Sequence, residues 1–268
     1  MIQMEQQITR DDKIRFLEER AVNAHGALKT QLYDGWILKY TFGFTCRSNS
    51  ISAIYSSTFP LEEKIDYCES CYKRQGLPCQ FKITDAESDR ELNAALKKRG
   101  YEVVTPTDVL TKDLGDVAPW SDVCSQIDSP TGTRVSFSSE PTEEWISAYC
   151  TYQGISDENT QQIFRQILSK APVKTRYGAI SKGEKIVACA AAALERGSML
   201  LQYVIVGKEY RGLGLGKQIC QSLLAQAKAD GAEHSYLQVV QTNEAAYSLY
   251  KKLGYKKEYA YWYMKKEQ

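Results

Sequence analysis

The sequence predicts an α/β (α+β) protein built from two copies of one helix–strand–helix–strand unit. The ends of the copies match, because Leu96-Lys97-Lys98-Arg99-Gly100-Tyr101 is similar to Tyr250-Lys251-Lys252-Leu253-Gly254-Tyr255. Upstream of each end, a helical pattern closed by a glycine is followed by a short strand pattern. These are 61–75, Gly76 and 79–84 in the first half, and 215–230, Gly231 and 235–240 in the second. A repeated order of elements indicates a duplicated structural unit.

The remaining elements follow from periodicity and turn residues. In the first half, helix 8–24 has apolar residues at helical spacing, the Asp34-Gly35 pair opens strand 36–44, and strand 102–111 closes the copy. The segment 114–133 is rich in Gly, Pro, Ser and Asp and marks a boundary, which predicts a domain 1–120, a linker 121–132 and a domain 133–268. The second domain adds strand 133–137, helices 141–152 and 159–169, strands 174–180, 185–195 and 199–206, and a last strand from 256 to 264.

One of these strands contradicts its own composition. The run from Val187 to Ala193 is mostly alanine, which has weak strand propensity and is compatible with a helix. We predict a strand because the run lies between two turn signals, Lys182-Gly183 and Arg196-Gly197.

Composition excludes several classes of protein. The chain has 268 residues, enough for two modest domains, and a net charge of +1, which offers no basic stripe for nucleic acid or anionic lipid. No apolar run approaches the length that spans a membrane, and the first residues lack a signal-peptide core, so we expect a cytoplasmic protein. The eight cysteines are then expected to be reduced. Cys68 and Cys71 form a single C-x-x-C on a helical pattern, which favours packed thiols over a metal site, and we predict no metal.

A glycine-dense turn carries the strongest functional signal. Tyr210-Arg211-Gly212-Leu213-Gly214-Leu215-Gly216-Lys217 lies between the apolar strand 200–206 and the helix from 215. Such a turn presents unpaired N–H groups at the positive end of a helix, where phosphate binds. A dinucleotide fingerprint fails, because the third glycine would fall on Lys217 or Ile219. A Walker loop fails as well, because Arg211 and Gln218 stand where it requires Gly and Ser or Thr.

The run Arg211 to Gly216 resembles the R/Q-x-x-G-x-G/A pyrophosphate loop of the GCN5-related N-acetyltransferases (GNATs). A second segment, Asn243 to Tyr255, is similar to the family's N-x-x-A-x-x-x-Y-x-x-x-G-[FY] motif, and the strands around both occur in the family's order. The resemblance covers about residues 133–268. It implies two tandem GNAT-like domains, each a mixed, mostly antiparallel twisted sheet flanked by helices. The first copy has no glycine between Gly43 and Gly76, so it resembles a degenerate GNAT half that has lost cofactor binding.

The resemblance also implies a reaction and a site. Acetyl-CoA would be the co-substrate and an amine the acceptor, by direct attack. The tyrosine of the second motif, Tyr250, would be the catalytic proton donor. The residues expected to bind the cofactor are Val204, Ile205, Val206, Arg211, Gly212, Leu213, Gly214, Leu215, Gly216, Lys217 and Asn243. Gln238 stands where some relatives have a glutamate base, which leaves the base unidentified.

Two other functions remain open at this stage. The chain could be a non-catalytic acyl-CoA sensor or scaffold that retains the loop, or an interaction protein without a ligand, although the three glycines disfavour the last. Tyr250 also has a packing interpretation, since a tyrosine on the apolar face of a helix usually serves the core. The acceptor could be a small metabolite, an aminoglycoside-like compound, a polyamine or a peptide N-terminus. The sequence does not define the oligomeric state.

Overall fold

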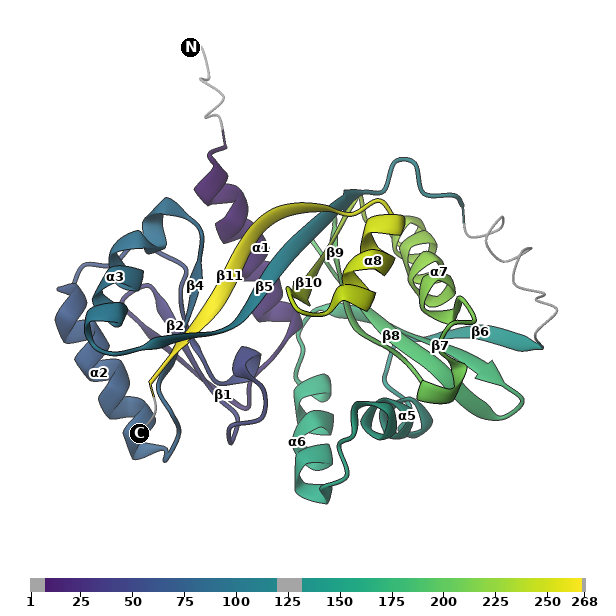
Figure 1. The fold of residues 1–268 in the computed structure, drawn as a ribbon, viewed down its shortest axis with the longest axis horizontal. Coiled ribbons are helices and arrows are strands. Elements are labelled where there is room, and N and C mark those ends of the chain that lie inside the picture. The colour runs from purple at the N-terminus through teal and green to yellow at the C-terminus, as the bar shows by residue number, and fades with distance from the viewer. Residues whose placement is uncertain (1–7, 120–131, 267–268) are drawn as a thin grey trace, which may run out of the picture. The chain divides into compact units, whose positions relative to one another are not determined.

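The computed structural model describes residues 8–119 and 132–266. The chain divides into two compact units (Figure 1). Unit 1 contains residues up to Thr107 together with Tyr259 and the residues after it, and unit 2 contains Asp108–Glu258. Almost all of the predicted linker 121–132 lies outside the described residues.

Unit 1 is a helix-flanked sheet whose strands run in the order β1-β2-β3-β4-β11. All its neighbouring strands are antiparallel except β3 and β4, which are parallel. Its elements are α1 (Arg10–Ala24), β1 (Lys29–Tyr33), β2 (Trp36–Tyr40), β3 (Ile51–Ala53), α2 (Leu61–Arg74), β4 (Gln80–Thr84), α3 (Arg90–Lys98), the start of β5 (Glu102–Asp113) and the end of β11 (Lys256–Lys265), with short 3-10 helices at Cys46–Ser48 and Glu87–Asp89.

The strands of unit 2 run in the order β5-β10-β9-β8-β7-β6. The pairs from β6 to β9 are antiparallel, whereas β9 and β10 are parallel, so the expected mixed, mostly antiparallel sheet is confirmed. Its further elements are β6 (Thr133–Ser138), α5 (Glu143–Gln153), α6 (Glu158–Ser169), β7 (Lys174–Lys182), β8 (Lys185–Glu195), β9 (Ser198–Val206), a 3-10 helix (Lys208–Tyr210), α7 (Leu215–Ala229), β10 (His234–Val240) and α8 (Glu244–Lys252).

The repeated helix–strand order is present in both units. In unit 1 a β–α–β segment joins the parallel strands β3 and β4 through α2, and in unit 2 the same segment joins β9 and β10 through α7. The second helix of each copy follows, α3 in one and α8 in the other. The last strands are exchanged, because β11 pairs with β4 and β5 lies next to β10. The division by contacts therefore cuts through β5 and β11, whereas the bounds predicted from the sequence follow the order of the repeat.

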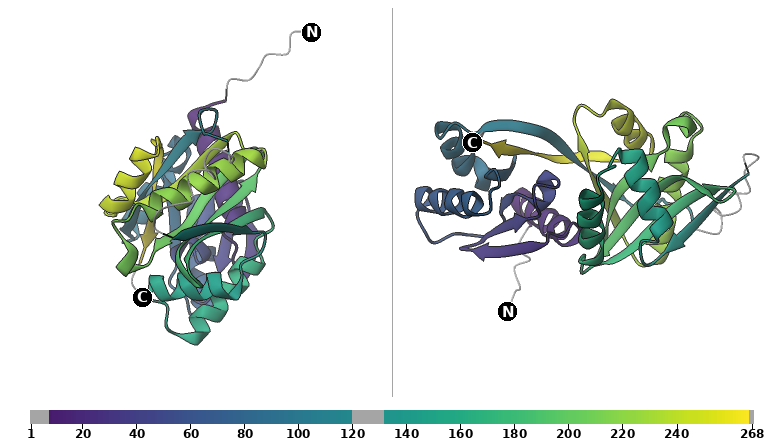
Figure 2. Two further views of the ribbon diagram at one scale, coloured as in Figure 1. Left: turned by 90° about the vertical axis from the view of Figure 1, so that its right-hand side faces the viewer. Right: turned by 90° about the horizontal axis from the view of Figure 1, so that it is seen from below.

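The alanine run is a strand, β8, as predicted from its position. Residues 187–193 are all buried between α7, which covers one face of the sheet, and α5, which covers the other (Figures 1 and 2). Small side chains let a helix approach closely on both sides, so tertiary packing outweighs the weak strand propensity of alanine. The thiols of Cys68, Cys71 and Cys79 are buried in the core of unit 1. Burial raises the pKa of Cys79 to about 12, which keeps this thiol protonated.

Candidate functional site

The parallel strands of unit 2 pair over only part of their length. Ser198–Leu201 of β9 lies opposite His234–Leu237 of β10. Beyond these residues β9 continues to Val206 and β10 to Val240, with no pairing between the two continuations. Val204, Ile205 and Val206 are half-buried at this opening. A strand edge without a neighbour can accept an extended ligand through its backbone amides.

A β-bulge in β9 lies directly before this strand end. Cys189 of β8 lies opposite Ile205, but Ala191 lies opposite Gln202, so β9 has extra length between these pairs. Tyr203 occupies this extra length with a φ of 57°, which is uncommon for any residue with a side chain. Its ring lies against Trp145, Tyr149 and Phe164, with centroids 6.1, 5.4 and 5.5 Å away. The sequence contained no signal of the bulge, because Tyr203 reads there as one more strand residue.

The glycine loop leads from this strand end into α7. Gly212 and Gly214 have φ values of 81° and 79°, a region that glycine adopts without steric cost. Gly214 is the N-cap residue of α7, and no side chain caps this helix. The first turn of α7 contains no acidic residue, whereas every other α-helix that we describe has at least one. The positive end of α7 is therefore not neutralised by the protein itself.

Gly216 brings three elements together. A Cβ atom at this position would lie 3.5 Å from Leu249 Cδ2 of α8 and 3.6 Å from Val206 Cγ2 of β9. Arg211 folds back from the loop, and its Nε donates to the Val206 carbonyl over 3.3 Å. The structure thus brings the predicted loop and the predicted strand edge together. Leu213 and Lys217 lie on the exposed side of the loop, and Leu215 is buried.

A hollow of about 730 Å³ lies beside Arg211. Lys185 and Lys208 also line it, together with residues of α5, and Lys185 pairs with Glu209 over 3.1 Å. Tyr152 of α5 lies so close to Gly207 that a Cβ atom there would come within 2.8 Å of its ring. The three cationic side chains outnumber the two carboxylates that line the hollow, Glu144 and Glu209, so this side of the loop favours an anionic group.

The two predicted residues of the second motif have different surroundings. Asn243 is the N-cap residue of α8, and its Oδ1 accepts from the Ala246 N–H over 3.1 Å. Tyr250 is 8% exposed and belongs to the core of unit 2, where its ring meets that of Tyr255 edge-on at 6.0 Å. Gln238 is half-buried on β10, directly after the last residue paired with β9.

A buried carboxylate, which the sequence analysis did not identify, holds the loop before α8 in place. Asp108 accepts from Gln241 Nε2 at 2.8 Å and from the Tyr247 hydroxyl at 3.1 Å, and it pairs with Lys257 Nζ at 2.8 Å. Burial raises the pKa of Asp108, but the bonds from Lys257, Gln241 and Tyr247 outweigh burial and leave this pKa below its usual value. The carboxylate thereby ties the loop before Asn243 to the helix after it. Gln241 lies 133 residues further along the chain, so no local pattern announces the contact.

Within residues 8–119 and 132–266, no group of three or more His, Cys, Asp or Glu side chains is arranged to hold a metal ion. In the same residues, no helix has the length and apolar character required to cross a membrane.

The chain is similar to known proteins in sequence and in fold. Residues 11–264 match the family described as "Probable histone acetyltransferase Rv0428c C-terminal". The chain is 30% identical over 251 residues to the uncharacterized N-acetyltransferase YobR of Bacillus subtilis, covering 91% of this chain and 95% of that protein. A GCN5-related N-acetyltransferase from Kribbella flavida has a similar fold, with a TM-score of 0.68 at 15% identity over 96% of this chain and 95% of its own. A tandem GNAT protein from the clavulanic acid biosynthesis pathway gives a TM-score of 0.63 at 10% identity, covering 77% and 69%.

Proposed function

This chain belongs to the GCN5-related N-acetyltransferase family, and on that premise we propose that it moves an acetyl group from acetyl-CoA to the amine of an acceptor. The observation that carries the proposal is the junction of an unpaired strand edge, 204–206, with an acid-free helix end at a glycine loop. Acetyl-CoA has groups for both, because its pantetheine arm contains amides and its pyrophosphate is an anion.

We assign the binding of the two parts to the backbone. The N–H groups from Gly212 to Lys217 would hold the pyrophosphate, with Arg211 at the entry of the loop. Val204–Val206 would pair with the pantetheine amides as a neighbouring strand does. Asn243 uses its Oδ1 for the helix cap, so its exposed side-chain amide nitrogen is the group that can reach the ligand.

The reaction that we infer is direct attack by a neutral amine on the thioester carbon. The new C–N bond forms, the C–S bond breaks, and the amine loses a proton. A backbone N–H within 204–206 would stabilise the negative charge that develops on the carbonyl oxygen. Tyr250 would donate a proton to the departing sulfur. Gln238 cannot accept the proton of the amine, so water or another side chain must do so.

Release of the free thiol of CoA tests the proposal. Purified protein with acetyl-CoA and a panel of polyamines, aminoglycosides and peptide N-termini should release thiol only when the acceptor is present. A non-catalytic acyl-CoA sensor would bind acetyl-CoA without amine-dependent release, and that outcome would replace the enzyme by the sensor.

Changing the charge at the start of α7 separates binding from folding. Gly216→Glu and Gly216→Gln have side chains of the same shape, so they differ only in a negative charge in the first turn. We expect the Glu variant to bind acetyl-CoA at least about tenfold more weakly than the Gln variant. The same charge should leave the helix equally stable or stabilise it by about 0.3–1 kcal/mol, because it complements the helix dipole.

Calorimetry gives both the affinity and the stoichiometry in this comparison, and wild type should show one site per chain. If the two folded variants bound acetyl-CoA with equal affinity, the assignment of the pyrophosphate to this loop would be wrong.

The role of Tyr250 is tested by removing only its hydroxyl. Tyr250→Phe should lower kcat by about ten- to ten-thousandfold and leave acetyl-CoA affinity nearly unchanged, as expected for a general acid. Tyr255→Phe is the matched control, because the Tyr255 hydroxyl lies 2.6 Å from Ser235 Oγ inside the core. That variant should lose stability and retain kcat. Wild-type turnover by Tyr250→Phe would leave Tyr250 with a packing role only.

A further inference from the structure

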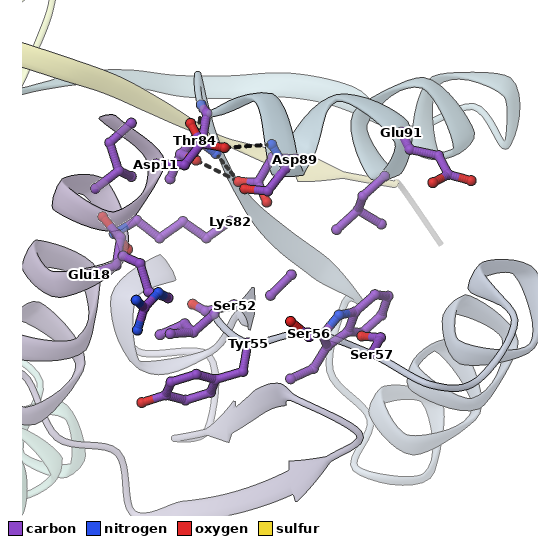
Figure 3. A pocket seen from close by; sticks show the side chains of 18 of the residues that line it. Asp11, Glu18, Ser52, Tyr55, Ser56, Ser57, Lys82, Thr84, Asp89 and Glu91 are labelled. Atoms are coloured by element: carbon purple, nitrogen blue, oxygen red, sulfur yellow. Dashed lines mark hydrogen bonds and ion pairs between the residues drawn. The ribbon is translucent and has the colours of Figure 1, made fainter. Parts of the chain in front are cut away.

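Unit 1 contains a hollow of about 860 Å³ beside its own parallel strand pair (Figure 3). Strands β3 and β4 pair only through Ile51–Ser52 and Phe81–Lys82. The chain after β3 and the end of β4 both line the hollow, as does α1. Its place in the β–α–β segment is therefore that of the opening between β9 and β10 in unit 2.

The ligand of this hollow cannot resemble that of unit 2, because a carboxylate of the protein already occupies the loop before α2. Asp34 accepts from the N–H groups of Thr58 and Phe59, at 2.9 Å each, and pairs with Lys64 of α2. The helix starts after Pro60, which has no N–H, and carries Glu62 and Glu63 in its first turn. A phosphate would meet negative charge here, so we expect no second site for acetyl-CoA.

The remaining charges of the hollow are unbalanced. Among the residues that line it, Glu18 pairs with Lys82, and Arg15 pairs with Asp12. Lys64 also lines the hollow and pairs with Asp34, whereas Asp11, Asp89 and Glu91 line it without a cationic partner in the part of the chain that we describe. The oxygens of Asp11 accept from the N–H groups of Glu87 and Ser88. Asp89 is 6% exposed and uses one oxygen to accept from the N–H and hydroxyl of Thr84. A buried carboxylate without a counter-ion favours a cation from outside.

Polar and aromatic groups complete the wall. Ser52 is 6% exposed, and its hydroxyl has no hydrogen-bond partner among the described residues. It lies between Lys82 and Tyr55, while Asp11, Thr84 and Asp89 gather on one side of the hollow (Figure 3). Tyr55 and Phe59 line the hollow and are 49% and 54% exposed, so their rings are accessible to a ligand. Aromatic faces attract organic cations as well as apolar groups.

From the cavity, the unpartnered Ser52 hydroxyl, the unbalanced carboxylates and the accessible rings, we propose that unit 1 binds a small organic ammonium ion. The carboxylates of Asp89 and Asp11 hold the ammonium group, and the Ser52 hydroxyl oxygen accepts a hydrogen bond from one of its N–H groups. The apolar part of the ligand lies on the rings of Tyr55 and Phe59. The site does not depend on acetyl transfer. Its ligand is either an acceptor amine or an effector, since both share this chemistry.

The test is calorimetry on the full chain without acetyl-CoA. The probes are n-butylamine, spermidine and 2-phenylethylamine, and 2-phenylethanol is the neutral counterpart. We expect at least one amine to bind with a stoichiometry of one per chain, and 2-phenylethanol to bind at least about tenfold more weakly than 2-phenylethylamine. Because acetyl-CoA is absent, failure here does not bear on the proposed transferase activity.

Variants locate the site. Asp89→Asn keeps an oxygen for the bonds from Thr84 and removes the charge, so it should weaken amine binding at least about tenfold. Asp116→Asn removes one charge from an exposed position of unit 2 and should change nothing. Asp11→Asn, on the half-buried side of α1, gives the same test if Asp89→Asn does not fold. No binding of any probe at millimolar concentration, or equal binding by folded Asp89→Asn and wild type, would overturn the proposal.

Turnover then distinguishes the two sources of the ligand. An acceptor amine is consumed when acetyl-CoA is added, and Asp89→Asn raises its KM. An effector is not consumed and changes the rate on another amine. Both results support the site.

Discussion

At the scale of single residues, the charge of Asp108 should make the stability of the protein depend on pH. Its pKa is lowered in the folded state, so its contribution is fully present above the unfolded value of about 3.9 and is lost as pH falls through the lower folded value. Asp108→Asn should cost about 1–3 kcal/mol of unfolding free energy at pH 7, because three donors lose a charged acceptor. Urea unfolding of both proteins at pH 7 and below pH 4 should show this difference narrowing in acid.

The control is Asp116→Asn, whose exposed carboxylate has no ion pair among the described residues, and which should match wild type at both pH values. A difference for Asp108→Asn that persists in acid would mean that shape, not charge, is what Asp108 contributes.

The contrast with the glycine loop shows what a sequence reveals about residues. Gly212 and Gly214 could be singled out from the sequence, because a backbone with positive φ favours glycine. Asp108 is a single aspartate in a predicted strand, and nothing in the sequence marks its contacts.

At the scale of elements, the bulge of β9 predicts an inverted order of two substitutions. Alanine is normally better than glycine in a strand, by about 0.5–1 kcal/mol. At Tyr203, where φ is 57°, alanine keeps the backbone strain that glycine relieves, at about 1–2 kcal/mol. Tyr203→Gly should therefore be more stable than Tyr203→Ala, although both lose the same ring contacts. Urea unfolding measures this, and Leu201, in the paired part of β9, should show the normal order.

If β9 were regular at Tyr203, Tyr203→Ala would be more stable than Tyr203→Gly.

The sequence predicted most helices and strands of both units, because periodicity and glycine turns are local signals. It did not predict β1 and β3, which are five and three residues long. Nor did it predict the bulge, since bulges depend on the partner strand rather than on the bulged residue alone.

At the scale of the whole molecule, the exchange of last strands is the feature that a repeat pattern cannot show. The sequence places β5 at the end of the first copy and β11 at the end of the second, and both assignments to a copy follow the order of the repeat. The order of strands along the chain does not determine which strands pair, however. In the structure β5 lies beside β10, and β11 lies beside β4. A domain defined as 133–268 therefore contains β10 with β9 on one side but without β5 on the other.

This exchange predicts how shortened chains behave. A chain of residues 133–268 exposes the backbone of β10 along the edge that β5 covers, and an open edge promotes association with other chains. A chain of residues 102–268 retains β5 and, directly after it, the Leu114 N–H that donates to the Glu233 carbonyl over 2.9 Å. Both lack β4, so they differ only in β5 and the segment 114–132 that follows it. We expect the longer chain to unfold at higher urea and to elute closer to its monomer size, and equal behaviour would show that β10 does not need β5.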